Sequence, residues 1–88
     1  MQLEQIEKEI DSYVRRRFRV APDDPGYDRD ADLYEDGYID SLGFAELTVF
    51  LEERFGVTVE GEDVVSDDFS SVAGISRIVE RLSRAGIA

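Results

Sequence analysis

Apolar residues recur at steps of three and four in three segments of this chain of 88 residues, and this spacing constrains its fold. Such spacing places the apolar side chains on one face of an α-helix. It predicts helices over residues 2–18 and 41–55 and a third that Ser70 or Ser71 caps and that ends before Gly86. The predicted inward-facing residues are Leu3, Ile6, Ile10, Val14 and Phe18 in the first, Phe44, Leu47, Leu51 and Phe55 in the second, and Val72, Ile75, Ile78 or Val79, and Leu82 in the third.

Residues that start and stop helices agree with these segments. Pro22 disfavours helical backbone before it, and Gly56 stands where a helix commonly ends. Residues 20–39 form a long loop, which we expect Leu33 and Ile39 to hold to the core, whereas residues 62–67 suit a short helical turn. We therefore expect one all-α domain over residues 1–88, a small four-helix bundle of three main helices and one short helix, with the long loop between helices one and two.

Composition removes several classes of function. The net charge of −11 opposes binding to nucleic acid, and the absence of cysteine and histidine removes thiolate metal sites and serine–histidine catalysis. An enzyme of this composition would have to use carboxylates, tyrosine, lysine or arginine, and no carboxylate pair stands out from the acidic background. The charged first residues are unlike a signal peptide, and no apolar run is long enough to insert into a membrane. We expect a cytoplasmic protein.

Residues 32–43, "DLYEDGYIDSLG", have two interpretations. In the first, Asp32, Asp36 and Asp40 are calcium ligands of an EF-hand-like loop. That loop ends in a bidentate glutamate, where this chain has Gly43, and an EF-hand needs a helix before the loop, where this chain has two prolines. A calcium-binding module remains an alternative, and only the three aspartates support it.

In the second interpretation, Ser41 is a modification site at the start of a helix. Unpaired backbone N–H groups and the helix dipole favour a phosphate there. Asp40 or Ser41 is also suited to be a plain N-cap, which would leave an unmodified helical adaptor as a further alternative. One face of the helix turns away from its core face and alternates apolar and acidic residues. We define this docking stripe, expected to be exposed, as Leu42, Glu46, Val49 and Glu53.

Residues 37–57, "GYIDSLGFAELTVFLEERFGV", resemble the acyl carrier protein family around its attachment motif, which corresponds to Asp40, Ser41 and Leu42. Residues 67–82, "DDFSSVAGISRIVERL", are similar to the family's last two helices. Gly37 lies four residues before Ser41 and Gly43 two after it, as in D-alanyl, aminoacyl and peptidyl carriers.

The resemblance implies that Ser41 bears a 4′-phosphopantetheine arm that holds an acyl or aminoacyl group as a thioester. A phosphopantetheinyl transferase would attach the arm from coenzyme A, with Asp40 helping to orient its magnesium. A loading ligase and downstream transferases would bind Leu42, Glu46, Val49 and Glu53. The carrier would be a monomer that catalyses nothing, and its cargo and pathway stay open.

Overall fold

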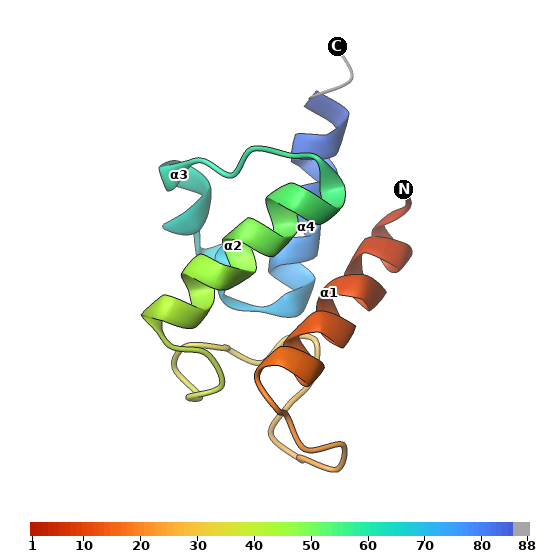
Figure 1. Ribbon diagram of the computed structural model, residues 1–88. Helices are drawn as coiled ribbons and strands as arrows, with labels where there is room; N and C mark the ends of the chain where they lie inside the picture. The colour runs from red at the N-terminus through yellow and green to blue at the C-terminus, as the bar shows by residue number, and fades with distance from the viewer. Residues whose placement is uncertain (86–88) are drawn as a thin grey trace.

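The computed structural model describes residues 1–85 (Figure 1). In this part of the chain, loops join four α-helices and one 3₁₀ turn. These elements are α1 (Leu3–Arg17), α2 (Ser41–Phe55), α3 (Gly61–Val64), η1 (Asp67–Ser70) and α4 (Val72–Ala85). No strand occurs in this part of the chain, which confirms the all-α prediction. Gly86, predicted to follow the last helix, lies outside the described residues. No helix within residues 1–85 is both long and apolar enough to cross a membrane.

The core lies where α1 and α4 pack together and α2 passes across α4 (Figure 1). Burial of each large apolar side chain removes it from water and stabilises the fold by roughly 1.5–3 kcal/mol. Five predicted core residues lie instead at the half-buried margin, namely Leu3, Phe18, Phe44, Phe55 and Leu82. The fully buried large apolar side chains of the three long helices are Ile6, Ile10, Val14, Leu47, Leu51, Val72, Ile75, Ile78 and Val79.

The long loop between α1 and α2 is held to the core by Leu33 and Ile39, both buried as their apolar character predicted. The backbone N–H of Leu33 donates to the carbonyl of Ser70 at 2.8 Å, which ties the loop to η1. The N–H of Ala73 donates to the carbonyl of Arg29 at 2.9 Å, which ties the loop to α4. The loop therefore has a fixed path to the first residue of α2.

Two short elements replace the helical turn predicted over residues 62–67. α3 ends at Val64, and η1 follows it and packs against α4. Gly74 permits this contact, because a Cβ atom there would lie 1.9 Å from the backbone oxygen of Asp68. Ser71, rather than Ser70, caps α4, since its hydroxyl accepts a hydrogen bond from the N–H of Gly74 at 3.0 Å.

Candidate functional site

Ser41 is the first residue of α2, and Asp40 is its N-cap. The Asp40 Oδ1 atom accepts a hydrogen bond from the N–H of Gly43 at 2.8 Å, so the Asp40 side chain caps the helix. Ser41, the other candidate for the cap, does not have this role. The side chain of Ser41 is exposed, and its hydroxyl has no hydrogen-bond partner within residues 1–85. The serine is therefore free to be modified without the loss of a cap.

The start of α2 is an electrostatically favourable place for an anion. The first N–H groups of a helix have no intrahelical partner, and the aligned peptide dipoles place roughly half a positive charge at this end. α2 has 15 residues and no acidic residue in its first turn. A phosphate bonded to the Ser41 hydroxyl would thus lie beside free N–H donors.

Gly43 allows the first turn of α2 to lie against the end of α1. A Cβ atom at Gly43 would lie 2.7 Å from Ile39 Cγ2 and 2.8 Å from Phe18 Cε1. The glycine is therefore a packing requirement, which no pattern in the sequence revealed. This contact places the last turn of α1 beside the turn that presents Ser41.

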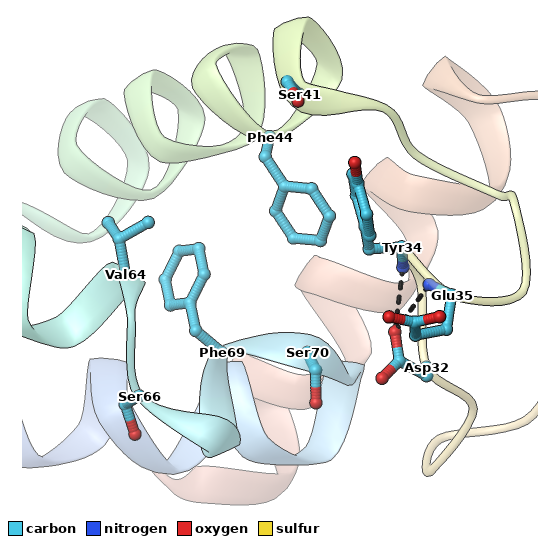
Figure 2. Close-up of a pocket in the computed structure, with 9 residues that line it drawn as sticks. All are labelled: Asp32, Tyr34, Glu35, Ser41, Phe44, Val64, Ser66, Phe69 and Ser70. Atoms are coloured by element: carbon cyan, nitrogen blue, oxygen red, sulfur yellow. Dashed lines mark hydrogen bonds between the residues drawn. The ribbon is translucent and has the colours of Figure 1, made fainter.

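Ser41 lies at the rim of an open cleft of about 420 Å³ (Figure 2). The rings of Tyr34 and Phe44 lie 6.4 Å apart between centroids, and those of Phe44 and Phe69 lie 6.1 Å apart. These three rings form an aromatic wall that leads inward from the serine (Figure 2). The complete lining is Asp32, Tyr34, Glu35, Ser41, Phe44, Val64, Ser66, Phe69 and Ser70.

Several apolar residues near this cleft were not predicted from the sequence. Tyr34 and Val64 line it and remain 55% and 43% exposed, and the neighbouring Val65 is 81% exposed. Phe69 lines it as well but is buried. These residues could have been identified as apolar residues that stand within acidic segments. A search for helical periodicity does not detect such residues.

The three aspartates of the calcium interpretation do not converge on one point. Asp32 Oδ1 accepts from the N–H groups of Tyr34 at 3.1 Å and Glu35 at 2.8 Å, so it stabilises the turn, and Asp40 caps α2. No helix leads into the loop, because α1 ends at Arg17. Among residues 1–85, no three acidic side chains are grouped closely enough to hold a metal ion.

The docking stripe is largely exposed. Leu42 is 71% and Val49 is 53% exposed, and Glu53 is open to solvent. Glu46 differs from the expectation, because its carboxylate is half-buried in an ion pair with Arg17 of α1. Helical spacing alone could not reveal this pair, since Arg17 reaches Glu46 across the gap between two helices.

Aromatic side chains fill the space between α1 and α2 behind this ion pair. The Tyr13 and Phe50 rings stack with centroids 3.9 Å apart, and Phe18 and Phe55 extend the group at its two ends. Burial, followed by the negative charge of Glu46, raises the pKa of Tyr13. The gap between the helices is thus bridged by side chains.

An exposed, unbonded hydroxyl at the positive end of a helix fits covalent attachment through a phosphate, and comparisons with known proteins agree. The family described as "Phosphopantetheine attachment site" matches residues 8–79. Similar proteins include the D-alanyl carrier proteins of Streptococcus pyogenes serotypes M5, M49 and M1, each 41% identical over 56 residues, or 64% of this chain and 71% of the relative. The chain belongs to the phosphopantetheine attachment-site family, the carrier proteins that bear a covalent 4′-phosphopantetheine arm.

Proposed function

We propose that Ser41 carries the phosphopantetheine arm, and that the arm holds an aminoacyl or related acyl group for transfer between enzymes. The observation that carries this proposal is the division of roles at the start of α2. Asp40 supplies the cap, and Ser41 keeps an exposed hydroxyl at the positive end of the helix. The arm would supply a terminal thiol that holds the cargo as a thioester.

Attachment is a phosphoryl-type transfer from coenzyme A catalysed by a separate transferase. The Ser41 oxygen forms a bond to the phosphorus that bears the pantetheine, and the pyrophosphate bond of coenzyme A breaks. The nucleotide phosphate leaves, and the hydroxyl proton passes to a base of the transferase. The free N–H groups at the start of α2 then stabilise the phosphodiester charge.

We assign Asp40 a second role in this reaction. Its Oδ1 atom is bound to the N–H of Gly43, but the other carboxylate oxygen makes no hydrogen bond within residues 1–85. That oxygen lies one residue from the attachment site, where it would help the transferase orient its magnesium ion. The docking stripe, Leu42, Glu46, Val49 and Glu53, would bind this enzyme and later partners.

An aminoacyl cargo has the best support. The similar proteins named above are D-alanyl carriers at 41% identity. The partners would then be the transferase, a ligase that activates and loads the cargo, and downstream transferases. The carrier itself would catalyse nothing. It would act as a cytoplasmic monomer, where coenzyme A is available and where a net charge of −11 opposes self-association.

Intact-protein mass spectrometry tests the attachment. The protein is incubated with coenzyme A, magnesium and a promiscuous phosphopantetheinyl transferase. Wild type and Ser12→Ala, which removes an exposed serine of α1, should each gain the mass of one phosphopantetheine group, and Ser41→Ala should gain nothing. No gain by the folded wild-type protein would favour an unmodified adaptor, and a gain by Ser41→Ala would refute the assignment of Ser41.

A further inference from the structure

The two acids of the docking stripe have different surroundings. Glu46 accepts an ion-pair contact from the Arg17 guanidinium of α1, whose side chain remains 52% exposed. Glu53 has no ion-pair partner within residues 1–85. The docking stripe therefore has one carboxylate, that of Glu46, that is paired with a cation, and one, that of Glu53, that is unpaired within residues 1–85.

The neighbouring Phe18 ring helps to hold this pair in place. The Arg17 guanidinium lies 5.5 Å from the centroid of the Phe18 ring, and Phe18 in turn packs against Gly43 in the first turn of α2. No cation lies one turn away from Glu46 on α2 itself, where the neighbours are Leu42, Gly43, Val49 and Phe50. Arg17 is thus the cation that screens Glu46.

Glu53 stays free because its nearest neighbouring cation is directed elsewhere. Arg54 follows it in sequence, but the Arg54 guanidinium forms an ion pair with Glu9 on α1. The Glu9 side chain is 19% exposed, so this pair is more sheltered than the Arg17–Glu46 pair. The two helices are therefore linked by two ion pairs, of which one includes a residue of the docking stripe.

We propose that Arg17 screens Glu46 and so lowers the efficiency of a partner enzyme that places a cation there, such as the phosphopantetheinyl transferase. This inference rests on the proposed docking role of the stripe. The surface fits an enzyme that offers one cation to Glu53 and apolar groups to Leu42 and Val49. An enzyme that needs a second cation at Glu46 must first displace Arg17, and this displacement lowers its efficiency.

Arg16 provides a matched control for removal of the screen. It is an exposed neighbour on the same helix, and it has no ion pair within residues 1–85. Arg16→Gln and Arg17→Gln change the net charge equally, so long-range attraction to a basic partner changes equally in both. Only Arg17→Gln frees the Glu46 carboxylate.

The test measures kcat/KM for phosphopantetheine transfer to each variant at low and at high salt. An exposed ion pair is worth about 0.2–1 kcal/mol, so at low salt Arg17→Gln should exceed Arg16→Gln by about 1.5-fold to fivefold. High salt should reduce this difference. In a Glu46→Gln background, the two arginine variants should have equal kcat/KM.

Equal kcat/KM values for Arg16→Gln and Arg17→Gln in the native background would overturn the proposal. An advantage of Arg17→Gln that persists with Glu46→Gln would overturn it as well. Thermal unfolding of every variant separates these outcomes from loss of fold. Failure of the proposed function is distinguishable, because it would abolish transfer to the wild-type protein rather than equalise the variants.

Discussion

Replacement of Gly74 by alanine tests the packing that places η1 beneath the cleft. The new Cβ atom would meet the Asp68 backbone oxygen at 1.9 Å, so the backbones of η1 and α4 must separate by at least about 1 Å. Overpacking of this kind costs about 1–3 kcal/mol and sometimes more, and a rigid backbone oxygen favours the upper part of that range. Alanine returns about 1 kcal/mol through its helix propensity. We expect a net loss of about 2 kcal/mol in unfolding free energy.

Thermal and urea unfolding measure this loss. For a domain of this size, about 2 kcal/mol corresponds to a fall of roughly 8–16 °C in Tm. Gly61→Ala is the control, because a Cβ atom at that position meets nothing within 4 Å. The reasoning is refuted if Gly74→Ala is as stable as Gly61→Ala, since the close contact would then carry no energy.

Three further changes separate stability from function. Arg19, just after α1, has a left-handed φ of 55°, which glycine adopts with less strain. Arg19→Gly should therefore raise the free energy of unfolding by about 0.5–1 kcal/mol. Urea unfolding that shows no gain would contradict this. Asp40→Asn should keep the cap and stay within about 0.5 kcal/mol of wild type but slow phosphopantetheine transfer, whereas transfer at the wild-type rate would remove Asp40 from the reaction. The Arg29 guanidinium, through its hydrogen bonds, lowers the pKa of Glu7, so stability should fall as the pH drops below about 4.3 toward that lowered pKa. Glu7→Gln should reduce this acid-dependent loss in pH-resolved unfolding, and an unchanged pH profile would count against the pair.

The sequence was sufficient for features that depend on near neighbours. The bounds of α2 matched the apolar steps and the caps at both ends, and the loop anchors Leu33 and Ile39 were visible as apolar residues in a polar segment. Ser41 was recognisable as a candidate attachment site because Asp40, Ser41 and Leu42 resemble the attachment motif of carrier proteins at a predicted helix start. Each of these signals lies within a few turns of the chain.

Features that depend on distant parts of the chain were not predictable. The choice of Asp40 over Ser41 as cap needed the backbone geometry. The close contacts at Gly43 and Gly74 depend on which segments the fold brings together. Arg17 and Glu46 are separated by the whole long loop, so helical spacing treated Glu46 as an ordinary exposed acid.

We propose Ser41 as the residue that bears the arm. The most direct measurement is fragmentation mass spectrometry of peptides from the wild-type protein after reaction with coenzyme A and the transferase. We expect phosphopantetheine on the peptide that contains Asp40, Ser41 and Leu42, with the fragment masses placing it on Ser41. Attachment to Ser66 or Ser70, which line the same cleft, would contradict it.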